Sequence, residues 1–137
     1  MTVFQKETIR VRSWDDKFSD AFRGVRVGMR GQSSFQVHLP AALVVGLAAW
    51  ALRVTRWEWC LLVLCVALVW AAELFNSAIE TLARAITRDQ QPEIGDALDV
   101  ASGAVLVIAC GSAVVGLLIL GWRIAIWLSG WDPRLIL

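Results

Sequence analysis

Four polar side chains lie close together in an otherwise apolar stretch: Glu73, Asn76, Ser77 and Glu80. Their spacing of i, i+3, i+4 and i+7 puts them on one face of a helix. A charge near the centre of a bilayer costs at least ~2.5 kcal/mol on insertion scales, so a carboxylate retained there indicates a function. Glu73 lies about two helical turns deeper than Glu80. Burial disfavours its charged form, which suits proton transfer, whereas Glu80, nearer to water, suits a hard cation such as Mg²⁺.

Structural roles explain part of this face equally well. Asn76 and Ser77 can hydrogen-bond between helices, and Glu80 can form an ion pair with Arg84 at i+4. Neither explanation covers Glu73, because its own helix carries no cation within a turn or two. We therefore expect Glu73 to have a functional role.

The elements that must position these residues indicate an all-α membrane protein with an N-terminal amphipathic interfacial helix and three transmembrane helices. Of the 137 residues, 58% are hydrophobic, and long uncharged apolar runs are typical of membrane spans. We expect a single membrane domain over 1–137, with spans at 33–52, 57–86 and 97–122 and a C-terminal tail at 123–137. The net charge of +1 argues against a nucleic-acid partner, which requires a strongly basic surface.

The N-terminal region, 1–32, has the pattern of a helix at the membrane surface. Its apolar residues recur at spacings of four, three and four, and basic residues flank them. Such a stripe suits a helix in the headgroup region, and packing of the same helix on its own protein is the alternative. The stripe consists of Phe18, Phe22, Val25 and Met29, and the flanking cations are Lys17, Arg23, Arg26 and Arg30.

The distribution of basic residues predicts the orientation. With the N-terminus and the 84–96 loop in the cytoplasm, nine Lys and Arg residues lie inside and four lie outside, as the positive-inside rule favours. Tryptophans are typical of membrane interfaces, and five of them gather where the spans would meet the outer surface: Trp50, Trp57, Trp59, Trp122 and Trp127. We expect a cytoplasmic N-terminus.

Two segments separated by a polar loop carry a specific pattern. Residues 73–80 read Glu-Leu-Phe-Asn-Ser-Ala-Ile-Glu, and residues 99–106 read Asp-Val-Ala-Ser-Gly-Ala-Val-Leu. This pattern closely resembles the bacterial integral-membrane diacylglycerol kinase family, which also includes undecaprenol kinases. Phe22-Arg-Gly24 and Ser34-Phe35-Gln-Val-His38 extend the resemblance to roughly 18–120.

The resemblance implies a homotrimer in the bacterial inner membrane that transfers the γ-phosphate of Mg-ATP to a lipid hydroxyl group. Phosphoryl transfer of this kind needs positioning, charge neutralisation and a base. By the same resemblance, Glu73 is the general base with Asn76 as its polar neighbour, and Glu80 binds the metal. The remaining implied contacts are Asp96 and Asp99 for ATP, and Ser34, Phe35 and Ser102, together with Glu73, for the lipid.

The chain departs from the family pattern at four positions. Gln32 replaces a second metal-binding glutamate, Leu98 a phosphate-binding lysine, Arg84 an aspartate and Gln36 an arginine. Arg84 or Arg88 could supply the missing cation. Two further functions stay open: a catalytically degenerate member acting as a membrane scaffold or lipid-binding protein, and a small proton-coupled transporter.

Overall fold

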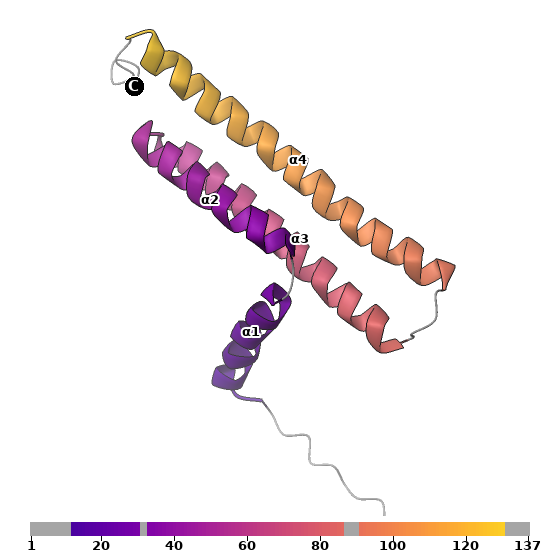
Figure 1. Ribbon diagram of the computed structural model, residues 1–137. Helices are drawn as coiled ribbons and strands as arrows, with labels where there is room; N and C mark the ends of the chain where they lie inside the picture. The colour runs from indigo at the N-terminus through magenta and orange to yellow at the C-terminus, as the bar shows by residue number, and fades with distance from the viewer. Residues whose placement is uncertain (1–11, 31–32, 87–90, 131–137) are drawn as a thin grey trace, which may run out of the picture.

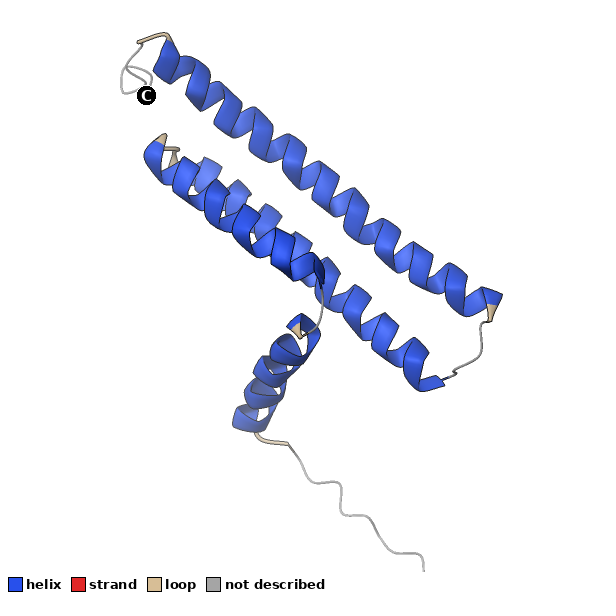
Figure 2. Ribbon diagram, viewed as in Figure 1, coloured by secondary structure: helices blue, strands red, loops and turns tan. Residues whose placement is uncertain are grey.

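The computed structural model describes residues 12–30, 33–86 and 91–130, and the regular secondary structure within these ranges is entirely helical (Figure 2). The helices are α1 (Trp14–Met29), α2 (Ser33–Ala51), α3 (Arg56–Ile86) and α4 (Pro92–Leu128) (Figure 1). Helices α2, α3 and α4 are long and apolar enough to cross a membrane. The prediction of an all-α membrane protein with three such helices is confirmed.

Helices α3 and α4 form a long hairpin, and α2 packs along the first part of α3 (Figure 1). The 31 residues of α3 and the 37 of α4 correspond to about 46 Å and 55 Å at ~1.5 Å per residue. Both helices exceed the ~30 Å hydrocarbon core of a bilayer, whereas the 19 residues of α2 nearly match it. The hairpin therefore extends past the start of α2.

A short turn reverses the chain between α2 and α3. Arg53 adopts a left-handed conformation with φ of 50°, and the Val54 N–H donates to the carbonyl of Ala49. The first turn of α3 is capped because the backbone N–H and hydroxyl of Thr55 donate to Oε2 of Glu58 at 2.6 and 2.8 Å. The Glu58 N–H donates in return to the Thr55 hydroxyl at 3.4 Å, which completes a capping box.

Packing and an ion pair hold the far end of the hairpin together. Ala49, Val54 and Leu62 form a buried cluster there, and Val45, Trp59, Ile119 and Leu120 pack against it. Beside the cluster, the Arg123 guanidinium donates to the Glu58 carboxylate through Nε at 3.0 and 3.1 Å and through Nη2 at 2.5 Å. This contact ties α4 to the capped start of α3.

Helix α1 begins with a second capping box. The Ser13 hydroxyl accepts from the Asp16 N–H, and the Asp16 carboxylate accepts from the Ser13 N–H, both at 3.1 Å. No α1 residue is buried, and Phe18 and Phe22 remain 62% and 76% exposed. Most of the apolar stripe of α1 is therefore not covered by the described part of this chain, although Met29 is half-buried. The place of α1 at the membrane surface stays a prediction.

The helix that contains the third predicted span begins earlier than position 97. Helix α4 starts at Pro92, which suits the first turn because its missing N–H would have no partner there. Glu93 occupies the first turn, so Asp96 and Asp99 lie farther along the helix. Neither aspartate therefore lies in the first turn, and both are exposed side chains on α4.

Candidate functional site

Glu73 is the charged side chain that the described residues bury most completely, with 2% of its surface exposed. Its own helix provides no cation within two turns of it, and the structure supplies a partner from α2. His38 places Nε2 at 3.0 Å from Oε1 of Glu73, within hydrogen-bonding distance. Sequence analysis missed this partner. The available signal was that His38 is the single histidine of the chain and lies in the first turns of an apolar helix.

The middle of the polar face of α3 is buried. Asn76 and Ser77 are 8% and 3% exposed, and Asn76 Nδ2 donates to Oε1 of Glu80 at 2.8 Å. Asn76 Oδ1 and Ser77 Oγ are buried and have no hydrogen-bond partner among the described residues. Because buried polar atoms are nearly always satisfied, these two oxygens are exceptions on this face of α3.

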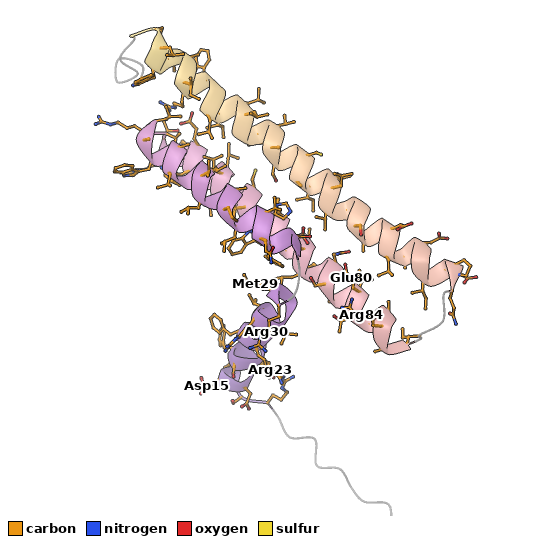
Figure 3. All side chains as sticks on the ribbon, in the orientation of Figure 1. Asp15, Arg23, Met29, Arg30, Glu80 and Arg84 are labelled. Atoms are coloured by element: carbon orange, nitrogen blue, oxygen red, sulfur yellow. The ribbon has the colours of Figure 1, made fainter. Side chains whose placement is uncertain are left out.

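Glu80 forms the predicted ion pair with Arg84. Nη1 of Arg84 lies 3.6 Å from Oε2 of Glu80, and Nη2 donates to the Thr81 hydroxyl at 3.3 Å. Both side chains project from the part of α3 that extends past the start of α2 (Figure 3). The Arg84 side chain is 67% exposed, and an exposed pair of this kind contributes only ~0.2–1 kcal/mol.

Phe35 fixes α2 against α3 close to the carboxylate. It is 5% exposed and packs edge-on against Trp70, with ring centroids 6.4 Å apart and an interplanar angle of 73°. Ser34, next to it in the chain, is half-buried. Phe35 and His38 are three residues apart, so they share one face of α2, and the aromatic contact sets the register in which His38 meets Glu73.

An apolar groove of about 480 Å³ runs between α2, α3 and α4. His38 and Trp70 lie at one end of its lining, and Leu62 and Leu120 lie toward the other. Ser112 is the remaining polar side chain in the lining, and its hydroxyl donates to the Cys65 carbonyl at 3.5 Å. The groove is therefore hydrocarbon-like along its length, and His38 is where it meets the buried carboxylate.

The predicted contacts on α4 lie on its exposed surface. Asp96, Asp99 and Ser102 are exposed, and the Ser102 hydroxyl donates to the Leu98 carbonyl at 3.0 Å. Across residues 12–30, 33–86 and 91–130, no group of three or more His, Cys, Asp or Glu side chains could hold a metal ion. One chain therefore does not gather Glu80 and these aspartates into such a cluster. Gln32 lies outside the described residues.

Comparison with known proteins matches this region of the chain. The family model described as prokaryotic diacylglycerol kinase matches residues 19–120, a range that includes His38, Glu73 and Glu80. An undecaprenol kinase from Bacillus subtilis (strain 168) is 35% identical over 102 residues, which cover 74% of this chain and 83% of that protein. The similarity thus includes α2, α3, most of α4 and the polar face of α3.

Proposed function

The chain belongs to the prokaryotic diacylglycerol kinase family, and we propose that it transfers the γ-phosphate of Mg-ATP to the hydroxyl group of a membrane lipid, either diacylglycerol or undecaprenol. Its family and its relative support a lipid kinase. The observation that carries the proposal is the position of Glu73. A carboxylate that is 2% exposed contacts His38, which lines the end of an apolar groove.

We assign the general base to Glu73. A lipid whose hydrocarbon chain lies in the groove would bring its hydroxyl group toward this carboxylate. Glu73 takes the hydroxyl proton, the hydroxyl oxygen forms a bond to the γ-phosphorus, and the bond from that phosphorus to the bridging oxygen of ADP breaks. Phosphoryl transfer demands mainly positioning and charge neutralisation, so a single positioned base meets the acid–base requirement.

Glu80 is the side chain that we propose as the ligand of a magnesium ion. Mg²⁺ in phosphoryl-transfer sites is held by one or two carboxylates together with substrate phosphates. Glu80 provides a carboxylate, and Asn76 holds it by donating from Nδ2 to Oε1 at 2.8 Å. When bound, the ion supplies neutralisation of the phosphate charge. We propose that Asp96 and Asp99 contact ATP from α4.

We propose that Arg84 supplies the phosphate-binding cation that the family otherwise takes from a lysine. In this chain that position is Leu98, which is half-buried on α4. Arg84 lies one turn beyond Glu80, and its side chain is 67% exposed. A guanidinium is well suited to phosphate because its donors match the geometry of two phosphate oxygens.

A homotrimer in the bacterial inner membrane, with the N-terminus in the cytoplasm, completes the proposal. The tryptophans of the predicted outer interface are mostly exposed, with Trp50 at 77%, Trp57 at 82% and Trp122 at 65%. They lie at the end of the helices opposite Glu80, as an interfacial belt requires.

A second candidate is a lipid-binding family member without kinase activity. Leu98 favours it, because an apolar side chain replaces a cation that would meet the phosphates. Glu73 disfavours it, because a scaffold has no need of a buried carboxylate, which is costly to retain.

The test of the proposed function is lipid phosphorylation by the purified protein in bilayers with Mg²⁺ and γ-labelled ATP, offering diacylglycerol and undecaprenol in separate reactions. We expect label in at least one of the two lipids. Glu93→Gln, which changes an exposed glutamate in the first turn of α4, serves as a matched control and should keep full activity. Label in neither lipid, from protein shown to be folded, would refute the kinase and favour the lipid-binding alternative.

A further inference from the structure

His38 is the feature of the site that the proposed reaction does not yet use. Its imidazole comes from α2, lies 3.0 Å from the Glu73 carboxylate and keeps 24% of its side chain exposed, against 2% for Glu73. It also lines the groove, and Glu73 is not among the lining residues. The imidazole thus lies between the groove and the carboxylate.

A buried carboxylate requires a fixed partner. Removing a carboxylate from water costs several kcal/mol unless hydrogen bonds or an opposite charge compensate for the lost hydration. The three glutamates of α3 each meet the side-chain nitrogen of a different residue: Glu58 meets Arg123, Glu73 meets His38 and Glu80 meets Arg84. His38 is the one of these three partners that is next to the groove.

The contact is held in place from α2. Phe35 is 5% exposed and packs edge-on against Trp70, one turn before Glu73 on α3. Since Phe35 and His38 lie on one face of α2, the aromatic contact keeps the imidazole from moving along α3. His38 Nε2 contacts Oε1 of Glu73, so Oε2 is the carboxylate oxygen that this contact leaves to other partners.

We propose that His38 is a positioning residue for Glu73. Its imidazole holds the carboxylate so that the second oxygen accepts the proton of the lipid hydroxyl as that hydroxyl attacks the γ-phosphorus of ATP. This inference rests on the proposed kinase function. It assigns His38 no proton transfer of its own, and so any side chain that donates from the same place should replace the imidazole.

Kinetic constants of His38 variants test this role. Gln places an N–H donor where imidazole Nε2 lies, and Ala places none there. We expect His38→Ala to lower kcat by roughly 10- to 100-fold, because a misplaced catalytic group costs up to about 10²-fold, while KM for the lipid changes little. His38→Gln should restore most of kcat. Leu39→Ala is the matched control on the next residue of α2, which is exposed and does not line the groove, and it should behave as the unchanged protein does.

Two kinetic results would overturn the inference. One is full activity of the His38→Ala variant, measured where the wild-type protein is itself active. The other is a His38→Gln variant as slow as His38→Ala, which would show that a donor at this place does not suffice to position Glu73. If the wild-type protein phosphorylates neither lipid, the proposed function fails together with this inference, and that result is distinct from the other two.

A spectroscopic readout tests the contact without relying on turnover. The chain has one histidine, so ¹⁵N-histidine labelling of a protein without a histidine tag reports on His38 alone. We expect Glu73→Gln to shift the imidazole Nε2 resonance, and Glu93→Gln to leave it unchanged. An Nε2 resonance that is the same in the wild-type protein and in Glu73→Gln would show that the contact does not exist.

Discussion

The ion pair between Glu58 and Arg123 should be a main source of stability and have no part in catalysis. The Arg123 side chain is 10% exposed and that of Glu58 is 20% exposed. Three nitrogen–oxygen distances between them are 3.1 Å or shorter. Breaking a fully buried pair costs ~3–5 kcal/mol and an exposed pair contributes ~0.2–1 kcal/mol. For this half-buried pair we expect a coupling free energy of about 1–3 kcal/mol.

A double-mutant cycle separates this energy from the capping role of Glu58. Glu58→Gln weakens both the ion pair and the capping box with Thr55, whereas Arg123→Met removes only the ion pair. The cycle subtracts the capping contribution, which is about 1 kcal/mol for a helix N-terminus. Thr55→Ala is the control, because it removes the cap and leaves the guanidinium in place. Reversible unfolding in mixed micelles, followed by tryptophan fluorescence, measures each free energy of unfolding.

The same variants should leave catalysis intact. Glu58 precedes Glu73 by 15 residues on α3, a separation of about 22 Å at ~1.5 Å per residue. Lipid phosphorylation per folded protein should therefore match the wild-type rate at a temperature where the variants remain folded. A coupling free energy below about 0.5 kcal/mol, the level of an exposed pair, would refute the stability estimate. Loss of turnover in folded Arg123→Met would refute the separation of stability from catalysis.

Three further predictions concern the site and its supports. Glu80→Gln should raise the Mg²⁺ concentration needed for half-maximal turnover by about 10-fold or more, because it removes a carboxylate ligand; an unchanged Mg²⁺ titration would exclude Glu80 as a ligand. Leu98→Lys should lower KM for ATP, and Arg84→Ala should raise it, because both change the positive charge available to the phosphates; turnover measured against ATP concentration checks both, and an unchanged KM in Arg84→Ala would remove that arginine from the proposal. A Cβ at Gly28 would lie 2.7 Å from Leu74 Cδ2, so Gly28→Leu should loosen α1 from α3 at a cost of about 1–3 kcal/mol, while Gly28→Ala should be tolerated because the tip of Leu74 can move. Faster amide exchange over α1 in Gly28→Leu alone is the expected observation, and equal exchange in both variants would contradict it.

The helices and the polar face of α3 were predictable from the sequence because each depends on local spacing. Apolar runs of spanning length predict α2, α3 and α4, and the i, i+3, i+7 spacing of Glu73, Asn76 and Glu80 predicts a shared face. The ion pair of Glu80 with Arg84 was predictable for the same reason, since its partners are four residues apart on one helix. Helix α4 begins at Pro92, before the apolar run that predicts its span, so the apolar pattern alone does not predict this start.

The contacts between helices could not be predicted from local spacing. His38 and Glu73 lie on two different helices, α2 and α3. Their pairing depends on the rotation of α2 about its axis, which the aromatic contact of Phe35 sets. A strongly apolar helix gives little information about which face is turned inward, because lipid and protein neighbours are equally apolar. The bidentate contact of Arg123 with Glu58 could not be predicted from the sequence either, because each residue alone is typical of a helix end at the membrane surface.

The most direct test of the central claim compares kcat for the wild-type protein and Glu73→Gln at saturating Mg-ATP and lipid. Gln keeps the size of the side chain and a possible contact with His38 but removes the proton acceptor. A general base contributes about 10²- to 10⁴-fold in rate, so we predict a loss of at least about 10²-fold in kcat with an unchanged unfolding midpoint. A Glu73→Gln protein that phosphorylates lipid at a rate close to that of the wild type would contradict the assignment of Glu73 as the base.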